Sequence, residues 1–239
     1  MRTAREIEQA RATGRKRLPR AVREQQMLDA AVAVFSAAGF HDASMDEIAA
    51  RAGISKPMVY AYLGSKEELF LACLHREGTR LMEAVASAVA PADAPSLPPD
   101  EQLWRGLRAF FAFVGAHRDG WRVLYRQARG TEPFVAELGA MRARMVDVVC
   151  VLLSRVIAGA ARGAGAGPCS PAGSGRPPRA VDVTAMAYAL VGAGESLADW
   201  AVDHSEEPPE TTATRLMNFV WLGAGELLGG AVWRPSTVD

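Results

Sequence analysis

Residues 44–70 constrain the fold of this chain more than any other segment, because their sequence (SMDEIAARAGISKPMVYAYLGSKEELF) reads as three short helices joined by tight turns. Ser44 and Glu47 have the spacing of a capping box, in which a hydroxyl and a glutamate satisfy the first amides of a helix. Ser65 and Glu68 repeat that spacing. Two helix starts are therefore marked within this stretch.

The turn between the first two of these helices is marked as well. Gly53 suits the left-handed backbone that ends a helix. Ser55 is a candidate cap for the next helix, and Pro57 falls in its first turn, where a missing N–H costs little. The segment therefore predicts a helix-turn-helix whose second helix, about 56–63, enters the major groove of DNA.

The side chains of this segment suit contact with DNA. The residues expected to bind it are Ser44, Ser55, Lys56, Pro57, Met58, Tyr60, Tyr62 and Lys66. The hydroxyls and the ammonium of Lys66 can reach phosphates, whereas Lys56, Pro57 and Met58 are expected at base edges. The alternative is a helical corner that only packs on a core, with its two tyrosines as ordinary half-buried aromatics.

The segment resembles the DNA-binding domain of the TetR family of bacterial transcription regulators. The resemblance begins near Arg23, continues through LDAAVAVFSAAGF (28–40) and ends near Phe70. One departure is Leu63, where the family usually has an aromatic residue; either is apolar, so packing changes more than recognition. The most specific part is Ser55, Lys56, Tyr60 and Tyr62, followed by GSKEELF (64–70).

The resemblance implies an all-α fold, with an N-terminal three-helix helix-turn-helix head and a C-terminal helical bundle that dimerises. Together with the residues discussed below, it leads us to expect a ligand-responsive homodimeric repressor on a palindromic operator in double-stranded DNA, released by a small, largely apolar effector. The alternative is a helical small-molecule-binding protein or enzyme whose helix-turn-helix is purely structural. A duplex-binding assay at two salt concentrations separates the two, because affinity for DNA falls as salt rises.

Three regions are expected along the chain: a basic disordered arm at 1–20, the DNA-binding domain at 21–67, and a ligand-binding and dimerisation domain at 68–239. The formal net charge is zero, yet residues 1–23 carry +6 and residues 71–239 carry −2. The arm either adds attraction to phosphates or is a solvated tail without specific contacts.

Helical periodicity and its breakers predict the remaining elements. The first helix is expected at about 21–38, stopped by Gly39, and a long helix at 65–90 joins the head to the body. A Gly/Pro-rich stretch at 163–179 is expected to be a mobile loop. The other helices are predicted near 100–116, 121–129, 132–162, 180–203 and 209–231.

The last two helices, 180–203 and 209–231, are rich in glycine and alanine yet strongly apolar. Small residues let helices approach closely, which offsets the cost of glycine inside a helix. Two interpretations of these helices are open: they are ordinary core helices of a monomer, or they form the interface of a dimer. Two-fold reading of DNA favours the dimer.

Aromatic residues cluster in 104–145 and indicate an apolar ligand pocket, with packing in the core as the alternative. Ala112 and Val149 are guesses at positions in its wall. Glu195 is a lone acid in an apolar run, able to pair with an arginine across an interface or to face a cationic ligand group. The candidate ligand-binding residues are Phe111, Trp121, Tyr125, Met145, Tyr188 and Glu195.

No motif indicates catalysis, a cofactor or a metal. The histidines lie in different predicted elements, and the cysteines lack metal-binding spacing. No apolar run is long enough to span a membrane, and the N-terminus is charged where a signal peptide is apolar. The sequence therefore predicts a cytoplasmic protein with no membrane partner.

Overall fold

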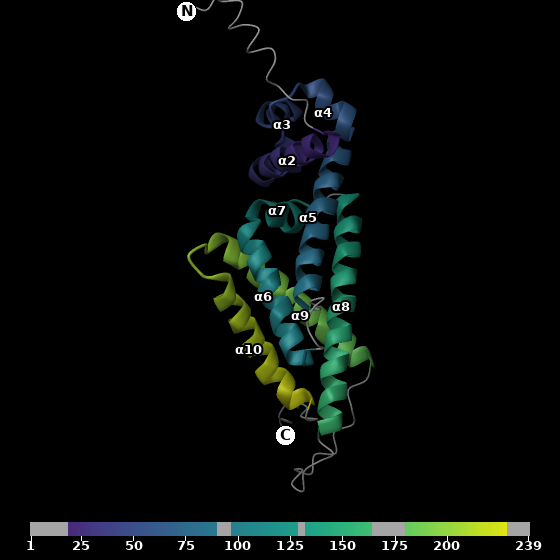
Figure 1. Ribbon diagram of the computed structural model, residues 1–239, viewed down its shortest axis with the longest axis vertical. Helices are drawn as coiled ribbons and strands as arrows, with labels where there is room; N and C mark the ends of the chain where they lie inside the picture. Colours follow the sequence, from purple (N-terminus) through teal and green to yellow (C-terminus); the bar gives the residue numbers. More distant parts are fainter. Residues whose placement is uncertain (1–18, 90–96, 129–131, 164–179, 229–239) are drawn as a thin grey trace, which may run out of the picture. The chain divides into compact units, whose positions relative to one another are not determined.

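The computed structural model describes residues 19–89, 97–128, 132–163 and 180–228, and these residues form helices without any strand (Figure 1). The chain divides into two compact units, Met1–Cys73 and Leu74–Asp239. Helix α5 (Lys66–Val89) contributes its first residues to the first unit and continues into the second. The expected all-α class is confirmed. The arm at 1–18 and the loop at 164–179 lie outside the described residues.

The first unit is built from α2 (Arg20–Asp42), α3 (Met45–Ala52), α4 (Lys56–Leu63) and the start of α5. The predicted stop at Gly39 appears as a break inside α2, where this glycine has φ 81°. A short helical turn then carries the chain to Asp42. The core of the unit is apolar and includes Met27, Phe35, Ile48, Val59, Leu69 and Phe70.

The second unit contains the rest of α5 with α6 (Pro99–Ala116), α7 (Arg118–Arg122), η1 (Val123–Gln127), α8 (Phe134–Gly163), α9 (Ala180–Asp203) and α10 (Pro209–Leu228). Helix α6 packs on α10, and α8 packs on α9 (Figure 1). The predicted single helix at 121–129 is instead α7 followed by η1, one turn of π-helix.

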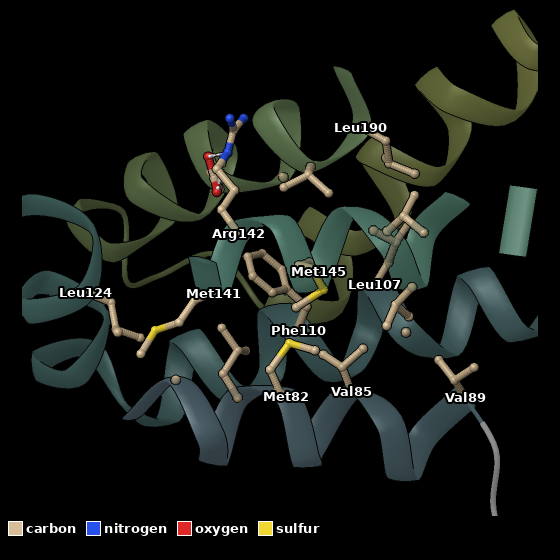
Figure 2. Close-up of a pocket in the computed structure, with 18 of the residues that line it drawn as sticks. Met82, Val85, Val89, Leu107, Phe110, Leu124, Met141, Arg142, Met145 and Leu190 are labelled. Atoms are coloured by element: carbon tan, nitrogen blue, oxygen red, sulfur yellow. Dashed lines mark hydrogen bonds and ion pairs between the residues drawn. The ribbon is translucent and has the colours of Figure 1, made fainter. Parts of the chain in front are cut away.

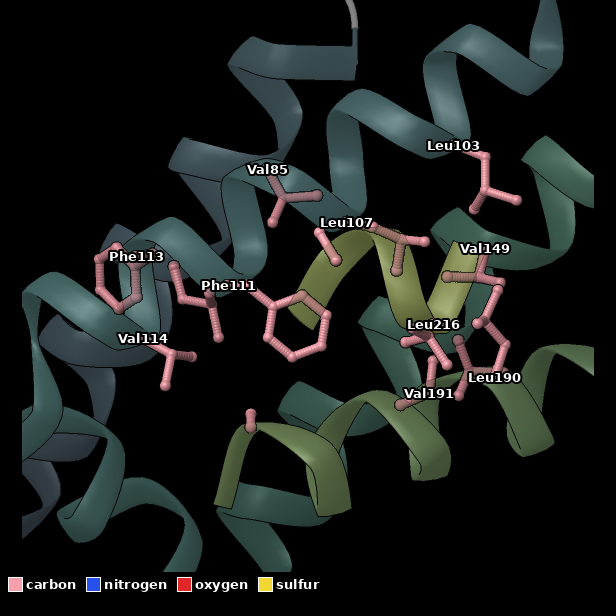
Figure 3. Packing of buried hydrophobic residues seen from close by; sticks show 14 of the residues in the cluster. Val85, Leu103, Leu107, Phe111, Phe113, Val114, Val149, Leu190, Val191 and Leu216 are labelled. Atoms are coloured by element: carbon pink, nitrogen blue, oxygen red, sulfur yellow. The ribbon is translucent and has the colours of Figure 1, made fainter. Parts of the chain in front are cut away.

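The core of the second unit lies between these helices. Phe111 is 2% exposed and points among the aliphatic side chains of α6, α8, α9 and α10 (Figure 3). The residues around it include Leu107, Val149, Leu190, Val191 and Leu216. This core positions the helices that form the pocket described below.

A buried carboxylate of α5 lies against α7 within the second unit. Glu77 is 2% exposed, and its carboxylate accepts from Arg76 at 2.8 Å and from Arg80 at 3.4 Å. A Cβ at Gly120 would lie 2.6 Å from the Oε2 of Glu77. The absence of a side chain at this position of α7 therefore leaves room for the buried carboxylate.

Gly120→Ala should lower the free energy of unfolding by about 1–2 kcal/mol, because the new methyl group must displace a carboxylate held by two arginines. Gly139→Ala is the matched control, since it also adds a methyl group to a helix but meets nothing within 4 Å. This control should gain about 0.5–1 kcal/mol from helix propensity. Urea unfolding of both variants measures the difference, and equal stabilisation of the two would contradict the packing of Glu77 on α7.

Candidate functional site

Ser44 is the N-cap at the start of α3, but its Oγ accepts from the amide of Asp46 at 3.2 Å rather than from that of Glu47, its partner in the predicted capping box. The turn at the other end of α3, before α4, is held by backbone bonds that its sequence favours. Gly53 has φ 67° and ψ 32°, and the amide of Ile54 donates to the carbonyl of Ala49 at 3.0 Å. This is the left-handed helix ending expected of a glycine.

Helix α4 begins at Lys56 and has Pro57 in its first turn, as predicted. Ser55 occupies the N-cap position of α4, as predicted, but its side chain makes no capping hydrogen bond. The helix is anchored instead by its buried side chains, Val59 and Leu63.

The opposite face of α4 is open. Lys56 and Pro57 are exposed, Tyr60 is 46% exposed, and Met58 is half-buried. Tyr62 is also half-buried, and the guanidinium of Arg20 lies 5.3 Å from the centre of its ring. Arg20 was not among the residues predicted to bind DNA, although it belongs to the basic segment 1–23.

Both lysines of this surface already hold partners within the first unit. Lys56 Nζ donates to the carboxylate of Asp46 at 2.8 Å, and this hydrogen bond raises the pKa of Lys56 above its ordinary value. Lys66 Nζ donates to the carbonyl of His41 at 2.8 Å and lies 5.1 Å from the centre of the Phe40 ring. A phosphate bound by either ammonium must therefore share or replace these partners.

At the start of α5 the predicted capping box is confirmed. The amide of Ser65 donates to the carboxylate of Glu68 at 2.7 Å, and the amide of Glu68 donates to the hydroxyl of Ser65 at 3.1 Å. Gly64 precedes the box with φ 71°, a backbone region that favours glycine. Lys66 is thereby held in the first turn of a well-capped helix.

A second candidate site is a cavity among α5, α6, α8 and α9 in the second unit (Figure 2). Its volume is about 120 Å³, far above the ~10–15 Å³ that one water requires. Aliphatic, aromatic and methionine side chains form nearly all of its wall. They include Met82, Val85, Val89, Leu107, Phe110, Leu124, Met141, Met145 and Leu190.

The cavity has one charged pair. Arg142 of α8 donates from Nε to the two carboxylate oxygens of Glu195 of α9, at 3.0 and 3.1 Å. The two alternatives drawn from the sequence for Glu195 were an arginine across an interface and a cationic ligand group. The structure supplies an arginine of the same chain, 53 residues away.

The structure places four of the six predicted ligand-binding residues in the cavity wall, namely Trp121, Tyr125, Met145 and Glu195. The other two lie elsewhere. Phe111 points into the core, and Tyr188 is 48% exposed with the Arg142 guanidinium 5.7 Å from its ring centre. Of the two guessed wall positions, Val149 lines the cavity and Ala112 is exposed.

The aromatic part of the wall comes from α6, α7 and η1. The Trp121 ring stacks on the Tyr125 ring, with 5.0 Å between the ring centres, and meets the Phe110 ring edge-on, with 5.5 Å between the centres. Arg126, next to Tyr125, ties η1 to α9 through Asp199 and Asp203, each at 2.6 Å. The hydrogen bond from Arg126 holds the pKa of the Asp203 carboxyl below its ordinary value.

Sequence reasoning missed the contribution of α5 to this wall. Leu81, Met82, Val85 and Val89 recur at helical spacing along it, a pattern that signals a buried face but not a cavity. Among the described residues no cluster of metal-ligating side chains occurs. Within the same part of the chain, no helix has the length and apolar character needed to cross a membrane.

Comparison with known proteins gives matches in both units. Residues 27–73 match the model of the bacterial regulatory proteins of the tetR family, and residues 99–168 match that of a tetracyclin repressor-like C-terminal domain. The crystal structure of a TetR-like transcriptional regulator from Rhodococcus sp. RHA1 is 45% identical with a TM-score of 0.70. That match covers 87% of this chain and 99% of the other.

Two curated relatives match over shorter stretches. The transcriptional activator FasR of Mycolicibacterium smegmatis is 39% identical over 140 residues, which cover 58% of this chain and 62% of FasR. The transcriptional repressor SCO4008 of Streptomyces coelicolor is 34% identical over 113 residues, 47% of this chain and 52% of that protein. The chain thus spans less than two thirds of either curated relative.

Proposed function

The chain belongs to the TetR family of bacterial regulatory proteins, and from this premise we propose that it is a homodimeric, DNA-binding transcription regulator without catalytic activity. The observation that supports this most is the exposed face of α4 in a helix-turn-helix, with Lys56, Pro57 and Tyr60 outward and Val59 and Leu63 buried. Residues 21–67 then form the DNA-binding domain, and residues 68–239 carry the ligand and the dimer interface.

Each subunit places α4 in the major groove of one half-site of a palindromic operator. Lys56, Pro57 and Met58 face base edges. The sugar-phosphate backbone of the DNA is contacted by the remaining candidates, Ser44, Ser55, Tyr60, Tyr62 and Lys66. Because Asp46 holds Lys56 in the free protein, DNA binding exchanges a carboxylate partner for a phosphate or a base. Such an exposed ion pair is weak, so the exchange costs little.

The cavity of the second unit is proposed to bind a small, largely apolar effector, since its wall is almost wholly apolar. A bound effector shifts the protein toward a state with lower DNA affinity, through differential binding of the two states. In this scheme the protein is a repressor, because it blocks transcription while bound to the operator and the effector releases it. Its curated relatives include both an activator and a repressor, so the direction is a separate point to measure.

The test is binding to genomic fragments of double-stranded DNA at about 50 and about 200 mM salt. A regulator should select a few palindromic fragments, with affinity falling steeply between the two concentrations. Transcription from a promoter carrying a selected fragment then shows whether the protein lowers or raises expression. Absence of DNA binding at both concentrations would favour the alternative, a helical ligand-binding protein or enzyme with a structural helix-turn-helix.

The dimer interface is proposed on α9 and α10, because large apolar side chains are exposed along them. Phe219 is 77% exposed, and Tyr188 and Trp221 are 48% and 40% exposed. Exposed apolar surface of this kind marks an interaction site. A two-fold axis through these helices would pair each surface with its copy.

Phe219→Asp should convert the dimer to a monomer at micromolar concentration, because a carboxylate would be buried opposite apolar side chains of the partner. Val135→Asp is the matched control, since Val135 is 41% exposed on α8 and lies outside the proposed surface. Light scattering measures the mass of both variants. A dimeric Phe219→Asp protein, or equal dissociation of both variants, would refute the assignment of this face.

A further inference from the structure

The charged end of the cavity is formed by two side chains that neutralise each other. Glu195 accepts from Arg142 Nε through both carboxylate oxygens, and their side chains are 17% and 37% exposed. Figure 2 shows Arg142 on the side of the cavity opposite Met82 and Val85 of α5. A molecule that fills the cavity therefore meets one neutral polar end and an aliphatic remainder.

The far end of the Arg142 guanidinium is turned away from the aliphatic part of the cavity (Figure 2). Its Nε donates to Glu195, and its central carbon lies 5.7 Å from the centre of the Tyr188 ring, which is 48% exposed. The polar end of the cavity is therefore the ion pair itself, in which a positive and a negative group lie side by side.

A charged ligand would be repelled by the member of the pair that carries the same charge. A ligand carboxylate near Arg142 would also stand close to the Glu195 carboxylate, and like charges at such a distance repel. An ammonium beside Glu195 would stand equally close to the guanidinium of Arg142. In the partly desolvated cavity these repulsions are stronger than in water.

We infer that the Arg142–Glu195 pair selects uncharged, largely aliphatic ligands, such as an alkyl ester, ketone or amide, over alkyl carboxylates and alkylammonium ions. This inference rests on the proposed effector site. Glu195 acts as a specificity-determining residue, since its charge cancels the attraction that Arg142 would otherwise exert on anions. Such rejection of the wrong partner is a recognised source of specificity.

The experiment compares three probes with equal numbers of non-hydrogen atoms, methyl pentanoate, hexanoate and heptylammonium, by ligand-observed NMR titration. The wild-type protein should bind the neutral ester more tightly than either ion. Glu195→Gln, which keeps the shape and removes the charge, should shift the ratio of hexanoate to ester affinity by about tenfold or more toward hexanoate. Arg142→Gln should shift the ratio of heptylammonium to ester affinity toward heptylammonium.

The two variants control for each other. Both break the same ion pair, so a purely structural role would weaken all three probes alike in both proteins. Opposite changes of charge preference support the inference. Tighter binding of hexanoate than of ester to the wild type, or an unchanged ratio in Glu195→Gln, would overturn it while leaving the effector site in place.

Failure of all three probes to bind would overturn the inference together with the effector site. DNA binding by the same preparation would then show that the regulator assignment stands without it. Thermal unfolding of each variant identifies any that fail to fold, and the wild-type preference between ester and ions decides the question without a variant.

Discussion

Lys56→Glu should weaken binding to a selected operator duplex by about a hundredfold, because a phosphate or base contact of α4 is replaced by repulsion. Lys56 is exposed at the start of α4, where its ammonium donates a hydrogen bond to the carboxylate of Asp46. The charge reversal should also reduce the dependence of log affinity on log salt by about one to two units. Fluorescence anisotropy at several salt concentrations measures both quantities.

Arg144→Glu is the matched control for this variant. It makes the same charge reversal at an exposed position of α8, in the second unit. Long-range repulsion alone would weaken DNA binding similarly in both proteins. Equal affinities for Lys56→Glu and wild type would contradict the docking of α4.

Val149→Trp should abolish the response to an effector, with ligand affinity lowered by about a hundredfold or more, because the indole occupies the space that the ligand needs. Val149 lies in the cavity wall and is 9% exposed. DNA affinity should stay within about threefold, since the substitution lies in the second unit. Calorimetry with an identified effector and operator binding with and without it provide the measurement.

Ala112→Trp is the control for the volume change. Ala112 is exposed on α6 and does not line the cavity, so the same side chain should leave the response intact. A Val149→Trp protein that still releases DNA on adding effector would place the effector outside this cavity. A response lost in both variants would indicate a general effect of the added indole.

Local signals in the sequence predicted the helix-turn-helix because they act within one or two turns of helix. Gly53 adopts the left-handed backbone that only glycine tolerates easily, and Pro57 starts α4 with a backbone angle suited to a first turn. The Ser65–Glu68 box starts α5 by reciprocal bonds between neighbours. These effects require no knowledge of distant residues.

The same reasoning misjudged the side chains whose surroundings come from elsewhere. Phe110 and Phe111 are neighbours on α6 and point about 100° apart, so one lines the cavity and the other enters the core. Composition offers no means of choosing between them. The expected phosphate contact of Lys66 stays a prediction, but the hydrogen bond from its ammonium to the carbonyl of His41 on α2 could not be seen in the sequence.

Residue patterns were enough to predict the helical class, the approximate bounds of most described helices, the helix-turn-helix and the family resemblance. Packing of the helices was needed to show that Glu195 pairs with Arg142, that α5 lines the cavity, and that Tyr188 stays outside it. The physical reason is the range of each interaction. Caps, turns and helical periodicity join residues a few positions apart, whereas the cavity wall joins side chains from α5 to α9 that become neighbours only when the helices pack.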